Sequence, residues 1–189
     1  MKLLFIVRGC SVKLIFTLYL KEVVKKYFSS TELDFKQAIL TKILEGYFMA
    51  EIAQITLDGP AASGKSSAAK GLAKELNAYF VNTGDMYRAL TSVVLEKWID
   101  PETQIEELEK ILPEQDIRYV SGDGLELLLQ INGQLAQASQ VRSPEVAAKV
   151  SLVAKVPAVR KWLVTRQREA AELGLIVMEG RDIGTVVFP

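Results

Sequence analysis

The chain has 189 residues, 49% of them hydrophobic and 24% charged, which suffices for one ordinary domain with a buried core and an appendage. This composition disfavours disorder and collagen-like repeats, and the formal net charge of zero argues against a generally basic nucleic-acid-binding protein. The absence of histidine and the single cysteine, Cys10, exclude histidine-dependent triads, histidine-ligated metals, internal disulfides and CxxC metal sites. A lone cysteine also fits a reducing, cytoplasmic compartment.

Residues 1–48 differ in charge from the remainder of the chain. They carry eight Lys/Arg and four Asp/Glu and are therefore net positive, whereas the other 141 residues carry 15 Lys/Arg and 19 Asp/Glu and are net negative. Their apolar runs, within 1–7 and 14–20, are shorter than the roughly 20 residues that span a bilayer, and no convincing cleavage site follows. Residues 21–48 have helical spacing. Two interpretations of residues 1–48 remain open: an amphipathic arm that binds a membrane surface or a partner, and an extension without function. In the second case Met49 is an alternative translation start.

A strand, a glycine loop and a helix are predicted next. The apolar run Ile52–Leu57 predicts a buried strand that ends at a turn. Residues 59–66 (GPAASGKS) fit the pattern GxxxxGK[ST] at every fixed position. Apolar residues then recur with the spacing of one helix face from Ala69 to Leu76. A glycine turn before a core helix does not explain why Lys65 and Ser66 open that helix.

This arrangement favours phosphate binding. Glycines let the backbone curl so that its N–H groups point at phosphate oxygens, and the helix N-terminus adds partial positive charge. Lys65 can reach the outer phosphates, and the Ser66 hydroxyl can ligate Mg²⁺.

A second strand, Tyr79–Asn82, leads through Thr83 and Gly84 into another predicted helix. Tyr87 and Arg88 lie in its first turn, where an arginine opposes the helix dipole. Arg88 is therefore not placed for helix stability. We interpret it as a contact to a substrate phosphate, the alternative being an ordinary surface arginine.

The pattern changes after residue 100. Pro101 is expected to open a third helix that Pro113 stops. An antiparallel meander follows, with strands at 117–120 and 125–131 and a tight turn at Asn132-Gly133. Two further helices are predicted, from an N-cap at Ser143 to residue 155 and over 157–173.

The chain then returns to a buried parallel strand. The continuous apolar run Leu175–Met178 is typical of such a strand. It ends in the polar stretch 179–185, where α/β folds place ligands; a plain surface turn is the alternative.

Four blocks of sequence together resemble the bacterial cytidylate kinase family: Ile55–Ser67, Asn82–Leu90, Val141–Glu169 and Glu179–Pro189. The resemblance extends from Ile52 to the end of the chain. It implies a P-loop α/β fold, a parallel sheet flanked by helices, with a small antiparallel and helical insert for the nucleoside monophosphate. The expected divisions are an extension at 1–48, a P-loop core at 49–100 and 174–189, and an insert at about 101–173.

The resemblance also implies the reaction ATP + (d)CMP → ADP + (d)CDP with Mg²⁺, in a cytoplasmic monomer of pyrimidine nucleotide metabolism with neither a nucleic-acid partner nor a membrane span. The ATP phosphates are expected at Gly59, Pro60, Ala61, Ala62, Ser63, Gly64, Lys65, Ser66 and Ser67, with Ser66 as the metal ligand. The acceptor nucleotide is expected at Thr83, Tyr87, Arg88, Arg142, Arg181 and Asp182. Lys65, Arg181 and Asp182 are the expected catalytic residues; no general base is required, because the acceptor phosphate is already anionic.

The sequence departs from the family in three places. Thr83 replaces a common serine, and residues 134–140 lack the acidic and hydroxyl residues that usually precede the Arg142 position. The family also continues past Pro189 into a further strand, an arginine-bearing lid, and a final strand and helix. We therefore expect a truncated member in which the P-loop strand is an exposed sheet edge, the alternative being that the N-terminal run Leu14–Leu20 covers it. For the function, we keep a non-catalytic remnant that at most binds nucleotide as the alternative. A GTPase lacks support, since no NKxD motif is present.

Overall fold

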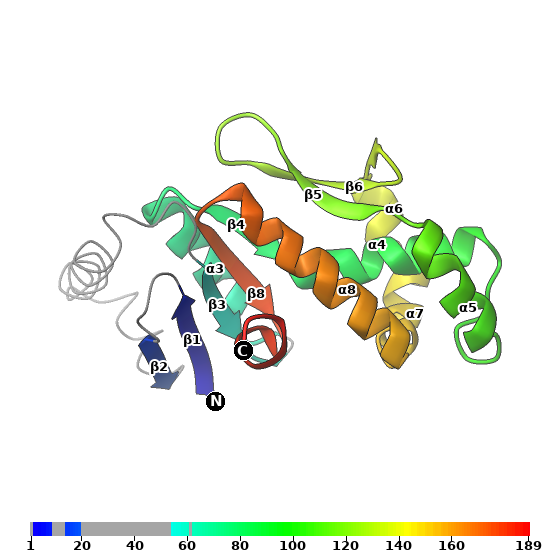
Figure 1. Cartoon of the computed structure of the whole chain (residues 1–189), viewed down its shortest axis with the longest axis horizontal. Helices are drawn as coiled ribbons and strands as arrows, with labels where there is room; N and C mark the ends of the chain where they lie inside the picture. The colour runs from blue at the N-terminus through cyan, green and yellow to red at the C-terminus, as the bar shows by residue number, and fades with distance from the viewer. Residues whose placement is uncertain (1, 9–13, 20–53, 61) are drawn as a thin grey trace. The chain divides into compact units, whose positions relative to one another are not determined.

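The computed structural model describes residues 2–8, 14–19, 54–60 and 62–189 (Figure 1). The chain divides into two compact units, residues 1–81 with 171–189, and residues 82–170. The helix that follows Asn82, expected with the P-loop core, therefore belongs to the second unit. Its buried side chains pack against that unit's own helices and sheet. No helix among the described residues is long and apolar enough to cross a membrane.

The first unit contains a five-stranded sheet with the order β2-β1-β3-β8-β4. Strand β3 (Gln54–Asp58) pairs in parallel with β8 (Ile176–Gly180), in a register that sets Asp58 opposite Gly180. All five residues of β8 are buried. The continuous apolar run predicts this for Ile176–Met178, whereas Glu179 and Gly180 come from the polar stretch that follows the run. Strand β4 (Tyr79–Asn82) lies on the other side of β8. The predicted α/β sheet is confirmed, and the carboxyl ends of β3 and β8 lie side by side.

The prediction that the P-loop strand is a sheet edge is wrong. Strand β1 (Lys2–Arg8) pairs antiparallel with β3 in the register Leu4↔Asp58 to Arg8↔Gln54. Strand β2 (Leu14–Tyr19) pairs antiparallel with the other side of β1. The backbone N–H and C=O groups of β3 thus have partners on both sides, which removes the edge that an unpaired strand would expose. The helix expected at 21–48 lies outside the described residues.

Helix α3 (Lys65–Glu75) covers this sheet through the apolar face that its sequence predicts. Its buried residues are Ala69, Leu72 and Ala73, and they belong to one cluster with β3 and β8 side chains that include Leu57 and Val177. Burial of these side chains, at about 25 cal/mol per Å² of apolar surface, fixes the start of α3 at the carboxyl end of β3.

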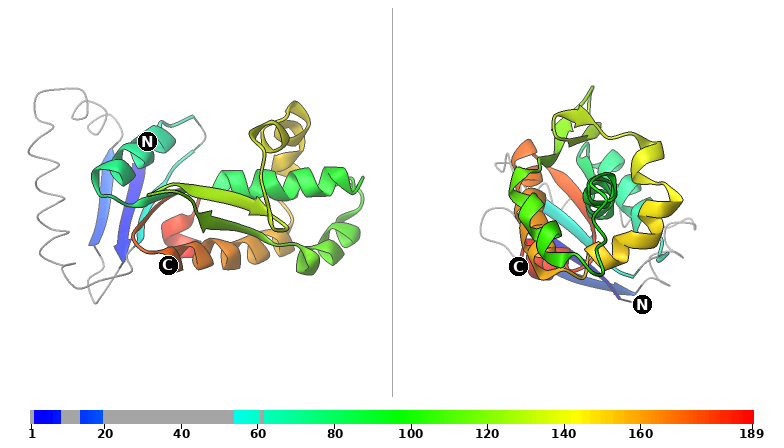
Figure 2. Two further views of the ribbon diagram at one scale, coloured as in Figure 1. Left: turned by 90° about the horizontal axis from the view of Figure 1, so that it is seen from above. Right: turned by 90° about the vertical axis from the view of Figure 1, so that its right-hand side faces the viewer.

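The second unit is built on helix α4 (Thr83–Glu96), most of whose residues are buried. The antiparallel ribbon of β5 (Ile117–Ser121) and β6 (Leu127–Ile131) lies along it (Figures 1 and 2). The other elements are α5 (Ile105–Ile111), a 3₁₀ turn (Leu112–Glu114), β7 (Gln134–Leu135), α6 (Ala138–Val141), α7 (Pro144–Val153), α8 (Pro157–Glu169) and a 3₁₀ turn (Ala170–Leu173) that runs into the first unit. The alternation between strands and helices is the predicted one, with β7 and α6 added.

Two predicted boundaries in this unit are wrong. Helix α5 begins at Ile105 and not at Pro101, because the Asp100 carboxylate accepts hydrogen bonds from the Glu102 N–H and the Thr103 hydroxyl and holds a turn there. Strand β6 begins at Leu127 and not at Leu125, because a turn closed by the Gly122 N–H and the Glu126 carbonyl extends that far.

Two turn signals in the same unit are confirmed. Asn132 and Gly133 have φ values of 51° and 82°, which a tight hairpin turn requires. Ser143 caps α7 by accepting a hydrogen bond from the Val146 N–H at 3.2 Å.

Candidate functional site

The loop after β3 has the backbone of a phosphate cradle. Gly64, immediately before α3, has φ 78°, and Ala62 has φ 58°. No side chain caps the N-terminus of α3, and its first turn contains no acid, so nothing in the helix neutralises its positive end. The Ser63 hydroxyl oxygen is buried and has no hydrogen-bond partner within the described part of the chain. Buried polar groups normally have one, which indicates a site built for a ligand that supplies it. The predicted residue Ala61 lies outside the described residues.

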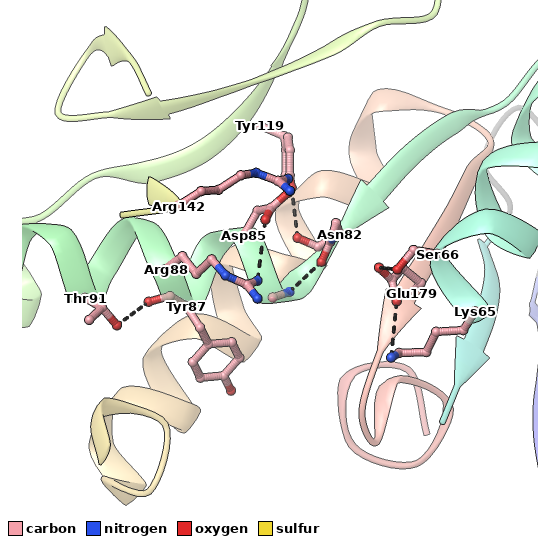
Figure 3. A network of polar contacts seen from close by, with 11 residues as sticks. Lys65, Ser66, Asn82, Asp85, Tyr87, Arg88, Thr91, Tyr119, Arg142 and Glu179 are labelled. Carbon is pink, nitrogen blue, oxygen red and sulfur yellow. Dashed lines mark hydrogen bonds and ion pairs between the residues drawn. The ribbon is translucent and has the colours of Figure 1, made fainter. Parts of the chain in front are cut away.

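Lys65 and Ser66 converge on one carboxylate at the end of β8 (Figure 3). The Ser66 hydroxyl donates to Oε1 of Glu179 at 2.6 Å, and the Lys65 ammonium lies 3.7 Å from Oε2. Lys65 also donates to the Pro60 carbonyl at 3.0 Å, so its side chain is folded over its own loop. Glu179 is 2% exposed, and a buried carboxylate requires such partners. Glu179 could have been found in the sequence as an acid at the carboxyl end of a buried parallel strand. The phosphate-loop motif at 59–66 does not include it, and we did not predict it as a site residue.

Asp58, the last residue of β3, holds the chain that follows β8. Its carboxylate accepts the Ile183 N–H at 2.6 Å and the Gly184 N–H at 2.8 Å, where a π-helical turn (Ile183–Val187) begins. Arg181 and Asp182 immediately precede this turn and are exposed, and Asp182 has φ 57°. Burial raises the pKa of Asp58 and the charge of Asp182 adds to this, against the lowering effect of the two N–H groups and of Lys65. Asp58 thus fixes the loop that contains two predicted site residues, although the sequence reading did not include it.

In the second unit, the N-terminus of α4 is tied down by two hydrogen bonds. The Asn82 side chain accepts from the Gly84 N–H at 2.9 Å, and the Tyr119 hydroxyl donates to the Asn82 carbonyl at 2.9 Å. A Cβ on Gly84 would lie 3.1 Å from Nη1 of Arg88, so the glycine leaves room for that guanidinium. Thr83 is buried, and Tyr87 packs against the core of the unit.

Asp85 brings together two of the predicted phosphate-binding arginines (Figure 3). Arg142, at the end of α6, donates from Nη2 to Oδ2 of Asp85 at 2.9 Å. Arg88, one turn along α4, places Nη1 3.6 Å from Oδ1 of the same carboxylate. From the sequence alone, Asp85 was one more acid in the first turn of a helix, and its role as the shared partner of two arginines was missed.

The first unit thus holds a phosphate loop with an acid beside it, and the second unit holds two arginines paired with one acid. A family model described as cytidylate kinase matches residues 55–189. The chain belongs to the cytidylate kinase family. The family predicted from the sequence is therefore confirmed.

The curated relatives of this cytidylate kinase family member include proteins named cytidylate kinase from Bacillus cereus (strain B4264), Bacillus thuringiensis (strain Al Hakam) and Bacillus anthracis (strain CDC 684 / NRRL 3495). Each is 44% identical over 135 residues, which are 71% of this chain and 59% of the relative. The chain thus spans less than two thirds of the length of these relatives.

The predicted site residues of this cytidylate kinase family member fall into two sets. Lys65, Ser66, Arg181 and Asp182 lie in the first unit, at the carboxyl ends of β3 and β8. Thr83, Tyr87, Arg88 and Arg142 lie in the second unit, at or near the start of α4. Within each unit the tertiary structure adds an acid that links members of the set: Glu179 in the first and Asp85 in the second.

Proposed function

We propose that the chain acts as a nucleoside monophosphate kinase that transfers the γ-phosphoryl group of ATP to CMP or dCMP. The observation that carries this proposal is the meeting of Lys65 and Ser66 with the buried Glu179 beside an uncapped helix N-terminus. The shared family and the name of the curated relatives supply the nucleotide class.

The ATP phosphates bind at the loop 59–67. The N-terminus of α3, which has no side-chain cap and no acid in its first turn, attracts anions, and the curled backbone directs N–H groups toward them. Lys65 exchanges its contacts with the Pro60 carbonyl and Glu179 for the outer phosphates. The buried Ser63 hydroxyl, which has no partner among the described residues, acquires one from the phosphates.

Mg²⁺ fits the donor set at this loop. Ser66 and Glu179 present a hydroxyl oxygen and a carboxylate oxygen 2.6 Å apart, and both are hard oxygen ligands. Mg²⁺ is usually held by one or two protein side chains together with waters and substrate phosphates. Ser66 and Glu179 together with the phosphates fit this pattern. When bound, the ion neutralises charge on the phosphates.

The acceptor phosphate binds Arg88 and Arg142 of the second unit. The family resemblance also assigns Arg181 and Asp182, of the first unit, to the acceptor nucleotide. Guanidinium groups suit this task because their planar N–H forks match phosphate oxygens. An oxygen of the CMP phosphate attacks the γ-phosphorus, the bond to the β,γ-bridging oxygen breaks, and ADP leaves with that electron pair. No base has to remove a proton, so side chains need only position the groups and neutralise charge. We further propose a cytoplasmic monomer acting on small molecules.

A coupled ADP-release assay on the full chain tests the proposal, with CMP, dCMP, UMP and AMP as acceptors. We expect turnover with CMP and dCMP above that with UMP and AMP, and its loss in Lys65→Ala. Lys74→Ala removes an exposed lysine from the last turn of the same helix and should leave turnover unchanged. ATP binding without turnover on any acceptor would overturn kinase activity and favour a nucleotide-binding remnant.

A further inference from the structure

Asp85 is an acid in a place where the proposed function needs positive charge. It lies in the first turn of α4, and its side chain is 18% exposed. Its two oxygens contact the two arginines of this unit that are proposed to bind the acceptor phosphate. Carboxylate and phosphate are the two anions that a guanidinium fork binds best, so Asp85 and a phosphate compete for the same donors.

We propose that Asp85 is an internal competitor of the acceptor phosphate and thereby sets the affinity of this site for nucleoside monophosphates. The inference rests on the proposed function, because it takes Arg88 and Arg142 to be phosphate ligands. In the empty site the carboxylate holds both guanidinium groups. When the substrate binds, its phosphate displaces Asp85 from at least one of them, and the free energy of that displacement is subtracted from the binding free energy.

The geometry favours exchange over a permanent clamp. Arg142 is held through one nitrogen, at 2.9 Å, and its side chain is 62% exposed, so it can turn to a ligand. Arg88 lies 3.6 Å from Oδ1, beyond hydrogen-bonding distance, and this buried oxygen has no hydrogen-bond partner among the residues that the structure describes. A carboxylate oxygen that is buried without a donor is poorly satisfied, so the contact to Arg88 is weak. A dianionic phosphate offers both arginines more charge and more acceptor oxygens than Asp85 does.

Competition and positioning by Asp85 predict opposite results for Asp85→Asn. If the carboxylate competes, its neutral isostere leaves the arginines more available, and CMP binds more tightly. If Asp85 mainly holds the arginines in a binding geometry, the same change weakens CMP. We expect tightening of about threefold or more at low salt, the scale of a partly exposed ion pair. The affinity for ATP should not change.

The test measures dissociation constants of CMP, inorganic phosphate and ATP by titration calorimetry on the full chain. Asp116→Asn is the matched control, because it breaks an acid–arginine pair of the same unit, between the half-buried Asp116 and the exposed Arg118, outside the site. Arg142→Ala with and without Asp85→Asn completes a double-mutant cycle, in which the tightening should shrink once Arg142 is absent. Asp85→Ser is the second variant if circular dichroism shows that Asp85→Asn does not fold.

Tighter CMP and phosphate binding in the Asp85 variant, with ATP and the Asp116 control unchanged, supports the inference. Unchanged or weaker CMP binding in a folded Asp85 variant overturns it, while CMP binding by the unmodified chain keeps the proposed function. A folded, unmodified chain that binds neither CMP nor phosphate overturns the proposed function and the inference together.

Discussion

Replacing Asp58 with alanine should lower the free energy of unfolding by about 2–3 kcal/mol. The change leaves the Ile183 and Gly184 N–H groups without their acceptor, and both residues are buried. An unsatisfied buried donor costs about 1–3 kcal/mol, so two such donors give about 2–6 kcal/mol. Burial of the charged carboxylate, which raises the pKa of Asp58, is itself unfavourable, and Asp58→Ala removes that penalty. The expected loss therefore lies near the lower end of this range. Asp58→Asn retains one acceptor oxygen, so its free energy of unfolding should lie between those of the native sequence and of Asp58→Ala.

The pH dependence has a definite sign. Because the folded-state pKa of Asp58 is raised above the ordinary value of 3.8, the native chain holds this proton more tightly than the unfolded chain. The part of Asp58's contribution that is linked to its proton is therefore fully present below the ordinary value and is lost as the pH rises through the raised pKa, whereas the two accepted hydrogen bonds remain. Between these two values, the stability advantage of the native sequence over Asp58→Asn should fall with increasing pH.

Urea unfolding followed by circular dichroism measures both effects, at pH 7 and in steps through the acid range. Asp123→Ala, an exposed acid in the turn before β6, is the matched control and should change stability by less than about 0.5 kcal/mol. An equally small loss in Asp58→Ala would refute the reasoning, because it would mean that the two N–H groups find acceptors elsewhere.

Three further outcomes are expected. Lys65→Ala should reduce turnover about 100-fold or more in the coupled assay, because removal of a preorganised positive group costs about that much. Full turnover in this variant would show that Lys65 does not bind the ATP phosphates. Arg88→Lys and Arg181→Lys should each weaken CMP far more than ATP in calorimetry, because lysine keeps the charge but loses the planar fork; equal losses would place these arginines outside the acceptor site. Ile6 lies in β1, which is paired on both sides, so Ile6→Pro should remove a backbone hydrogen bond and lower the free energy of unfolding by about 1–3 kcal/mol. The freed edge of β3 should then promote aggregation. An unchanged melting curve and unchanged solubility would show that β1 does not stabilise the sheet.

The local parts of the molecule were predictable from the sequence. The loop 59–66 between an apolar run and a helical face requires only residues that are close together in the chain, and the same is true of the Asn132-Gly133 turn and the Ser143 cap. Periodicity located the parallel strands because burial on both faces leaves a continuous apolar run. The start of β6 was wrong because the alternating pattern extends into the preceding turn, and the start of α5 was wrong because Pro101 was read as the helix opener. In both cases hydrogen bonds within the preceding turn decide the boundary.

The partners of these local parts were decided only by the tertiary structure. Glu179 meets Ser66 from 113 residues away, Asp58 holds a backbone N–H 125 residues on, and Arg142 reaches Asp85 across 57 residues. Strand β1 completes the sheet beside β3, although nothing in its apolar pattern selects that neighbour. Sequence patterns record which face of an element is buried, because burial repeats with the period of that element. A pairing between distant residues has no period, so it follows only from the folded chain that brings the two together.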